Sequence, residues 1–169
     1  MVCELLAPAG SVEAFRAAVE NGADAVYLSG KAFGARAYAP NFSDEELTEA
    51  VRYAHLRNVK VYVTVNTLVD DSEMRLLQEY LRFLYECEID AVLVQDLGVA
   101  AVARACVPQL PLHASTQMTV HNAAGVRFLR DLGFTRVVVS REMSLPELQQ
   151  CVQDGGAEIE SFVHGALCI

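Results

Sequence analysis

The sequence has no long apolar run and no visible secretion signal. No stretch approaches the ~18–20 consecutive apolar residues that are needed to span a bilayer. The first residues, Met1 to Glu4, contain no basic region followed by an apolar stretch, which a secretory signal requires. These absences argue against a membrane or secreted protein. We therefore expect a cytoplasmic protein with no membrane partner.

Basic residues are scarce and do not cluster. The chain has 13 Lys and Arg against 22 Asp and Glu, which gives a net charge of -9. A chain of this charge repels nucleic acid unless positive charge gathers locally. The basic residues near predicted strand ends are isolated, at Lys31, Arg36 and Arg141. Binding of an RNA or protein substrate is therefore expected to depend on segments outside this chain.

The cysteines are too scattered to form a disulfide framework or a complete metal site. No two of them form a Cys-x-x-Cys pair. They are Cys3, Cys87, Cys106, Cys151 and Cys168. The three on helical patterns are expected to be small core residues. His164 lies shortly before Cys168, so a Cys–His nucleophile pair and a structural histidine are both open interpretations.

Seven short apolar stretches alternate with helical patterns, which predicts βαβ units and a parallel sheet. The predicted strands are Glu4–Ala7, Asp24–Leu28, Val59–Val65, Asp90–Val94, Leu112–Ala114, Arg136–Val139 and Glu158–Val163. No Gly-x-Gly-x-x-Gly follows the first strand, so a (β/α) barrel of the TIM type is favoured over a dinucleotide-binding sheet. Such a barrel has eight strands. Residues 1–169 are therefore expected to form a single α/β TIM-barrel-like domain, incomplete with about seven parallel strands and truncated at its C-terminal side.

The sequence also predicts where several helices begin and where one long loop lies. Ser-x-x-Glu capping boxes, in which serine and glutamate satisfy each other's exposed amides, begin at Ser43 and Ser144. A helix is predicted from about Ser72 to Glu88, with a buried stripe of Leu and Tyr. Asp96 is expected to cap the helix that follows it. The connection from Ser29 to Phe42 is longer than usual, and long loops in compact domains are often functional.

Polar side chains follow almost every predicted strand. Parallel sheets bind their substrates at the carboxyl ends of their strands, so these groups predict a site there. The candidate substrate-binding residues are Asn66, Ser115, Gln117, Arg141, Glu142 and His164. Lys31 and Arg36 in the long loop are candidates for steering an anion into the barrel mouth. We expect these strand ends to converge on one pocket.

Strand alternation gives the candidates an orientation. Ser115 and Gln117 share the alternation of His113, so all three are expected to point toward the barrel mouth, with His113 in the core layer. Arg141 continues the alternation of the strand before it, and a guanidinium suits a carboxylate or phosphate of a substrate. Asn66 offers both a donor and an acceptor.

Each of these interpretations has a structural alternative. Asn66 is equally suited to capping the next helix. Arg141 is also suited to a salt bridge with Glu142 or with another neighbour. Lys31 and Arg36 are also compatible with a role as solvated charges on an exposed loop.

Several ordered blocks resemble those of a known family. They are Glu4–Gly10, Gly22–Leu28, Val61–Thr67, His113–Gln117, Arg141–Glu142 and Phe162–Cys168. Together they are similar to the N-terminal barrel portion of the collagenase-like peptidase family U32. The resemblance implies an enzyme that inserts hydroxyl groups into RNA bases or related rings, in some members with a cysteine-held iron–sulfur cluster. It also implies that Cys168 is one cluster ligand in the full-length protein, while no cluster is expected in this piece alone.

Three hypotheses for function result. The leading one is an iron–sulfur-dependent hydroxylase that modifies an RNA base or a related aromatic ring. The second is a collagenase-like peptidase, although the sequence contains no His-Glu-x-x-His zinc motif and no Gly-x-Ser-x-Gly elbow. The third is a non-catalytic barrel piece that binds a partner or forms a homo-oligomer, since open sheet edges tend to pair with another strand.

Overall fold

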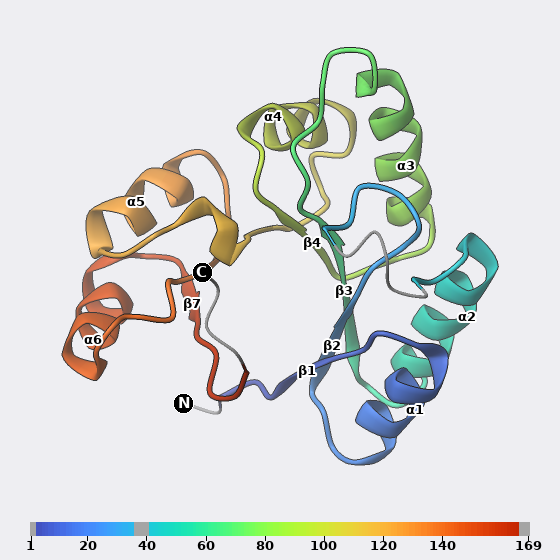
Figure 1. The fold of residues 1–169 in the computed structure, drawn as a ribbon, viewed down its shortest axis with the longest axis horizontal. Helices are drawn as coiled ribbons and strands as arrows, with labels where there is room; N and C mark the ends of the chain where they lie inside the picture. Colours follow the sequence, from blue (N-terminus) through green and yellow to red (C-terminus); the bar gives the residue numbers. More distant parts are fainter. Residues whose placement is uncertain (1–2, 36–40, 166–169) are drawn as a thin grey trace. The chain divides into compact units, whose positions relative to one another are not determined.

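The computed structural model describes residues 3–35 and 41–165. The chain divides into two compact units, Met1–Leu110 and Pro111–Ile169. Each unit alternates strands with helices (Figure 1). Over the described ranges, no helix combines the length and the apolar character needed to cross a membrane. The expectation of a single domain over the whole chain stays a prediction.

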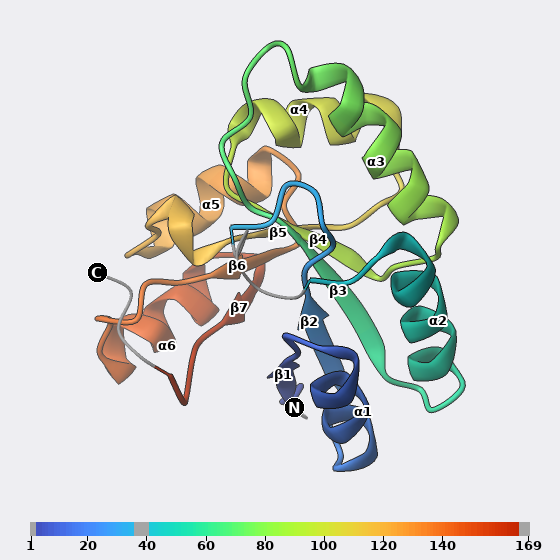
Figure 2. The same ribbon diagram turned by 45° about the vertical axis from the view of Figure 1, so that its right-hand side comes forward.

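The described part of the first unit contains four parallel strands and four α-helices. They are β1 (Leu6–Pro8), α1 (Val12–Glu20), β2 (Ala25–Leu28), α2 (Asp44–His55), β3 (Lys60–Val65), α3 (Met74–Glu86), β4 (Ala91–Val94) and α4 (Leu97–Cys106). The strands lie side by side in chain order, and all three pairings are parallel. The helices cover one face of this sheet, with α1 packed against α2 and α3 against α4 (Figure 2).

Buried aliphatic side chains hold this sheet together. Val26, Val61 and Val92, on three neighbouring strands, are fully buried. Leu47 and Ala54 of α2 are buried as well. Strands covered on both faces are made of near-continuous apolar runs, which is why the predicted strand positions agree closely with the observed ones. Each buried Val or Leu contributes about 1.5–3 kcal/mol to folding by leaving water.

Side-chain caps determine where the helices begin. The capping box at Ser43 is confirmed, because the Ser43 amide donates to Glu46 Oε2 at 2.8 Å and the Glu46 amide donates to Ser43 Oγ at 3.2 Å. Asp96 caps α4 as predicted and accepts from the amides of Gly98 at 2.6 Å and Val99 at 3.2 Å. Both caps satisfy amides that the first helical turn leaves without a partner.

Helix α3 begins at Met74, two residues later than predicted. The Asp70 carboxylate accepts from the amide of Ser72 at 2.8 Å and from its hydroxyl at 2.5 Å. Glu73 in turn accepts from the Asp70 amide at 3.1 Å. These bonds form a turn that satisfies Ser72 outside the helix. The predicted core stripe is confirmed, since the following residues of α3 are buried: Leu77, Tyr80, Leu81 and Leu84.

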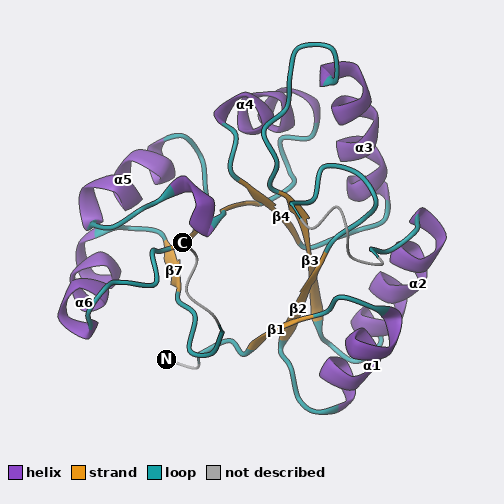
Figure 3. Cartoon of the chain, in the orientation of Figure 1, coloured by secondary structure: helices purple, strands orange, loops and turns teal. Residues whose placement is uncertain are grey.

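The described part of the second unit contains three strands, a 3-10 helix and two α-helices. They are β5 (Leu112–Ala114), η1 (Thr116–Met118), α5 (Ala123–Asp131), β6 (Arg136–Val138), α6 (Leu145–Asp154) and β7 (Glu158–Glu160). The strands pair in parallel in chain order. Helices α5 and α6 pack side by side (Figure 3). The second predicted capping box is present, because Glu147 Oε2 accepts from the amide and the hydroxyl of Ser144, each at 2.7 Å.

Strand β7 is shorter than predicted, and the expectation that it extends to Val163 is wrong. Its neighbour β6 ends at Val138. One further bond joins the Val139 amide to the Glu160 carbonyl at 3.1 Å. Beyond that bond the chain bends and Val163 is exposed. A strand continues only while its neighbour supplies hydrogen bonds, and residue type alone does not show where that supply ends.

A buried arginine sets the register of β6 against β7. Arg136 is 8% exposed and pairs with Glu158 at 2.8 Å and with Glu160 at 3.6 Å. Arg136 and Glu158 are also register partners in the parallel ladder. A buried guanidinium is costly unless it is paired, so a slipped register would leave this charge without its carboxylates.

Candidate functional site

The loop that follows β2 is fastened to the end of β3. The Ala35 amide donates to Asn66 Oδ1 and the Thr67 hydroxyl donates to the Phe33 carbonyl, both at 3.1 Å. Helix α3 begins only at Met74, so the alternative that Asn66 caps the next helix is wrong. The role of Asn66 in substrate binding stays a prediction. In the structure, the Asn66 side chain holds the loop that follows β2.

Two glycines let this loop pack closely against its surroundings. A Cβ on Gly34 would lie 1.9 Å from Ser29 Oγ, and a Cβ on Gly30 would lie 2.2 Å from the Tyr80 hydroxyl. Real Cβ contacts essentially never fall under 3.0 Å. The loop returns to its start through a bond of 2.9 Å from the Phe42 amide to the Ser29 carbonyl. The connection that the sequence marked as long therefore has tight packing at its described ends.

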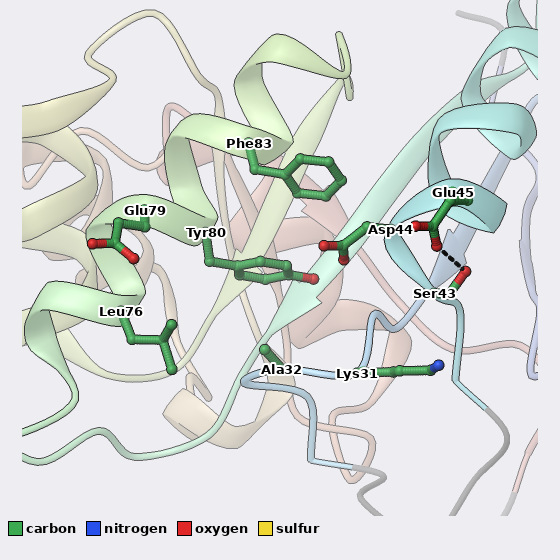
Figure 4. Close-up of a pocket in the computed structure, with 9 residues that line it drawn as sticks. All are labelled: Lys31, Ala32, Ser43, Asp44, Glu45, Leu76, Glu79, Tyr80 and Phe83. Atoms are coloured by element: carbon green, nitrogen blue, oxygen red, sulfur yellow. Dashed lines mark hydrogen bonds between the residues drawn. The ribbon is translucent and has the colours of Figure 1, made fainter.

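A cleft of about 560 Å³ opens beside this loop (Figure 4). Its lining comes from the loop, from the beginning of α2 and from one side of α3. Lys31 is exposed on this lining. Hydrogen bonds from the backbone at Glu45 and from the Ser43 hydroxyl, helped by the charge of Lys31, lower the pKa of Glu45. Lys31 thus lies among carboxylates, and its predicted anion steering stays a prediction. Arg36 lies outside the described residues.

Ser115 and Gln117 are brought together in the second unit, although not by strand alternation. The chain leaves the extended conformation after Ala114 and enters the 3-10 helix η1, so the prediction that strand alternation extends to Gln117 is wrong. His113 is buried, as predicted for a core-layer residue, whereas Gln117 is exposed. The Ser115 hydroxyl donates to Gln117 Oε1 at 3.3 Å and accepts from the Gln117 amide at 3.4 Å.

Arg141 is half-buried in the turn after β6 and lies over an aromatic ring. Its guanidinium carbon is 3.8 Å from the centroid of the Phe162 ring. Its Nε is buried and has no hydrogen-bond partner. Among the residues that the structure describes, no carboxylate pairs with Arg141, so the alternative of a salt bridge with Glu142 is wrong. Phe162 thus holds one face of the guanidinium, and no described group accepts from the buried Nε.

The segment after β7 lies beside Arg141. A Cβ built on Gly165 would be 3.7 Å from Arg141 Nη1. Both His164 and Glu142 are exposed, and no described group orients His164 for nucleophilic chemistry. Cys168, the predicted metal ligand, lies outside the described residues. The predicted roles of His164, Glu142 and Cys168 stay predictions.

The structure therefore forms two groupings in the second unit and one in the first. In the second unit, Ser115 lies with Gln117, and Arg141 lies with Phe162 and the His164 segment. In the first unit, Asn66 holds the β2 loop. That all these groups converge on one pocket stays a prediction.

Two aromatic residues were not selected by sequence reasoning. Phe162 lies within the predicted strand Glu158–Val163 and within a resembling block, but its contact with Arg141 depends on tertiary structure. Tyr80 was assigned to the core stripe of α3, and it is indeed buried. Its hydroxyl nevertheless has no hydrogen-bond partner, and its ring lines the cleft. An unpartnered hydroxyl cannot be recognised from helical periodicity.

The described residues do not form a metal site. No group of three or more His, Cys, Asp or Glu residues in residues 3–35 and 41–165 is arranged to hold a metal ion. The cysteines in these ranges are free thiols with different degrees of burial: Cys3, Cys87, Cys106 and Cys151. An iron–sulfur cluster normally needs four thiolates. The described part of the chain thus does not supply the ligand set of a cluster.

Comparison with known proteins identifies the family. The sequence profile described as Peptidase family U32 matches residues 10–169. The chain belongs to this family. Membership in peptidase family U32 agrees with the resemblance that the ordered sequence blocks indicated.

Two curated relatives carry names that refer to RNA. The 23S rRNA 5-hydroxycytidine C2501 synthase of Escherichia coli (strain K12) is 41% identical over 166 residues, which cover 98% of this chain and 25% of that protein. The tRNA hydroxylation protein P1 of Bacillus subtilis (strain 168) is 39% identical over 166 residues, which cover 98% of this chain and 39% of that protein. The U32 chain described here thus spans well under half the length of these relatives.

A solved structure supports the fold. The U32 peptidase Mk0906 matches with a TM-score of 0.78 at 16% sequence identity, covering 95% of this chain and 68% of that one. The predicted fold class is confirmed as an α/β fold of the TIM-barrel type, with seven parallel strands in the described part of the chain.

Proposed function

We propose that this U32 chain is part of an enzyme that hydroxylates a base of ribosomal or transfer RNA. The supporting observation is its similarity, over 98% of its length, to two relatives that are named for hydroxylation of these RNAs. The chain spans 25% and 39% of those relatives, so the activity is proposed for the whole protein. Within that protein, we assign to the described residues the binding and orientation of the RNA.

Arg141 is the residue best placed to bind the RNA backbone. Phosphate contacts dominate nucleic-acid affinity, and arginine suits them because its planar guanidinium donates in pairs. The Phe162 ring holds one face of the guanidinium, which leaves its edge for a phosphate. No described carboxylate competes for it. Because the chain carries a net charge of -9, each cation that no carboxylate neutralises helps it to bind RNA phosphates.

Ser115 and Gln117 are suited to a base edge. Single-stranded bases are recognised in RNA by hydrogen bonds to their edges, and an amide offers both a donor and an acceptor. Gln117 is exposed, and its side-chain oxygen accepts from the Ser115 hydroxyl at 3.3 Å. The buried Ser115 thus limits the rotation of the Gln117 side chain.

The test compares hydroxylated nucleosides in RNA from a host that lacks its own copy of the gene. The full-length wild-type protein is expected to restore a nucleoside that is heavier by one oxygen atom, detected by mass spectrometry of digested tRNA and rRNA. Arg141→Ala is expected to lower the product at limiting protein by about tenfold or more, because it removes a charged hydrogen bond. The matched control Arg75→Ala changes an arginine side chain that is 90% exposed on α3 and should leave the product level unchanged. If wild-type protein restores no oxygenated nucleoside, the proposal is wrong.

We also propose that Cys168 is one ligand of an iron–sulfur cluster in the full-length protein. The proposal rests on the resemblance of Phe162–Cys168 to a family block, and the remaining ligands would come from outside the described residues. A bound cluster supplies one-electron redox chemistry. Iron and sulfide analysis of anaerobically purified protein tests this without an activity assay. Cys168→Ser should lose both elements while Cys106→Ser keeps them, and equal iron in the two variants would remove Cys168 from the ligand set.

A peptidase activity, which the family name suggests, has no recognisable catalytic motif in this sequence. Neither a zinc motif nor a serine elbow occurs in the sequence. We therefore do not propose it for this chain.

A further inference from the structure

Aromatic rings form the inner wall of the cleft between α2 and α3. Tyr80 is buried, at 8% exposed, and the neighbouring Phe83 ring lies 6.2 Å away between centroids, with the two planes inclined by 26°. Figure 4 shows both side chains extending from α3 toward the beginning of α2. Phe33 from the loop packs on Tyr80 with centroids 5.8 Å apart. The faces of such rings are electron-rich and attract cations.

The rim of the same cleft is acidic. Asp44 and Glu45 come from the first turn of α2, and Glu79 comes from α3. All three are exposed, and Lys31 is the cation among the lining residues. The amides at the beginning of α2 are already engaged in the capping box, so an anion finds few donors there. The electrostatics of this lining favour a positively charged ligand.

The Tyr80 hydroxyl adds a polar group that the fold leaves unused. It is buried and has no hydrogen-bond partner. Burial, together with the nearby charge of Asp44, raises the pKa of Tyr80, so the group stays a neutral hydroxyl. Buried polar groups nearly always have a partner, and an exception points to a missing donor or acceptor.

We propose that this cleft binds the guanidinium of an arginine presented by a basic segment of a partner protein. Arginine fits better than lysine because its planar group stacks on aromatic faces and offers several N–H donors to carboxylates. A protein fits better than RNA because the phosphates of RNA would be repelled by Asp44, Glu45 and Glu79. The volume of about 560 Å³ accommodates the arginine side chain together with its flanking backbone.

The test uses ¹⁵N-labelled protein and three short peptides in an NMR titration. The peptides are acetyl-Gly-Arg-Gly-amide, its citrulline analogue, which is neutral but nearly the same shape, and its lysine analogue. We expect the arginine peptide to shift the amides of Lys31, Asp44 and Tyr80 saturably. The citrulline peptide is expected to bind about fivefold more weakly or not at all, and the lysine peptide to fall between the two.

Variants of the protein separate the cleft from the rest of its surface. Asp44→Asn and Phe83→Leu should each weaken binding of the arginine peptide about two- to fivefold. Glu86→Gln, which changes an exposed carboxylate of the same helix outside the cleft, should leave binding unchanged. Asp44 is exposed, so its variant is expected to fold normally, which unchanged spectra away from the cleft will show.

Three results would overturn the proposal. The citrulline peptide could bind as tightly as the arginine peptide, which would exclude recognition of the charge. Asp44→Asn could bind like wild type, which would place the site elsewhere. A single-stranded RNA oligonucleotide could displace the peptide and shift the same amides, which would identify the occupant as nucleic acid.

Discussion

The contact between Gly30 and Tyr80 allows a direct test of the packing in the first unit. Gly30→Ala is predicted to destabilise the protein, and Tyr80→Phe is predicted to restore most of that loss. The reason is a single atom. A Cβ at position 30 would meet the Tyr80 hydroxyl oxygen at 2.2 Å, whereas the next atom of that side chain, Cζ, lies at 3.3 Å and Leu47 Cδ1 at 3.7 Å.

The size of the effect follows from these distances. To accept alanine, the hydroxyl has to move from 2.2 Å to at least 3.0 Å, and Tyr80 is buried between α3 and the β2 loop. Overpacking of this kind costs about 1–3 kcal/mol. Tyr80→Phe alone is expected to be close to neutral or slightly stabilising, because the hydroxyl it removes has no partner. In the double variant the contact below 3.0 Å is gone and the tight contact with Cζ at 3.3 Å remains, so the coupling energy should be about 1–3 kcal/mol.

Urea unfolding followed by far-UV circular dichroism measures all four members of this cycle. Gly10→Ala is the matched control, because a Cβ there has nothing within 4 Å. Its free energy of unfolding should stay within about 0.5 kcal/mol of wild type. If the double variant is as unstable as Gly30→Ala alone, the hydroxyl is not the clashing atom. If Gly30→Ala is as stable as Gly10→Ala, the loop is not packed as described.

Three further predictions concern caps and loop anchors. Asn66→Ala removes the acceptor of the Ala35 amide. Hydrogen exchange at that amide should therefore become faster, and the free energy of unfolding should fall by about 0.5–1.5 kcal/mol. Unchanged exchange would show that the bond does not hold the loop. The hydroxyl and the amide of Ser144 lower the pKa of Glu147 below its ordinary 4.5, so its contribution to stability is present above that value and is lost as the pH falls through the folded pKa. The melting temperature of Glu147→Gln should therefore fall less than that of wild type on acidification, and parallel curves would contradict this. Ser43→Ala removes one half of the first capping box and should lower the free energy of unfolding, measured in urea, by about 0.5–2 kcal/mol. An unchanged free energy of unfolding would show that the cap does not stabilise the helix.

The positions of strands and helices were predictable because they depend on burial. Runs such as Val59–Val65 and Asp90–Val94 contain strands whose side chains are nearly all buried, and apolar β-branched residues mark them in any context. The capping roles of Ser43 and Asp96 were likewise predictable, because each accepts from backbone amides only a few residues away. Local chemistry was enough in these places.

The ends of extended segments were harder to predict because neighbours determine them. Val163 has the residue type of a strand, but among the described residues no strand ladder continues beyond Glu160, and Val163 is exposed. Gln117 lies in a 3-10 helix that Ser115 caps, and the alternation inferred from strand geometry does not extend that far.

The contacts of the candidate residues could not be predicted from the sequence, and their role in binding stays a prediction. Arg141 was selected for its place after β6, whereas its ring partner Phe162 follows β7. Asn66 was also selected, but its bond to Ala35 spans 31 positions of sequence. Pairings at this separation depend on the tertiary fold, which one sequence does not display.

The two bonds that join Asn66 and Thr67 to the preceding loop also constrain how this protein can diverge. A loop tied to the next strand end cannot lengthen, shorten or change its course without releasing its anchor. New specificity at this edge can therefore arise by changing loop side chains, because both bonds use the backbone amide and carbonyl groups of the loop. Libraries that vary loop residues other than Gly30 and Gly34 while Asn66 and Thr67 are kept should yield mostly folded variants, whereas libraries that vary 66 and 67 should lose the anchor.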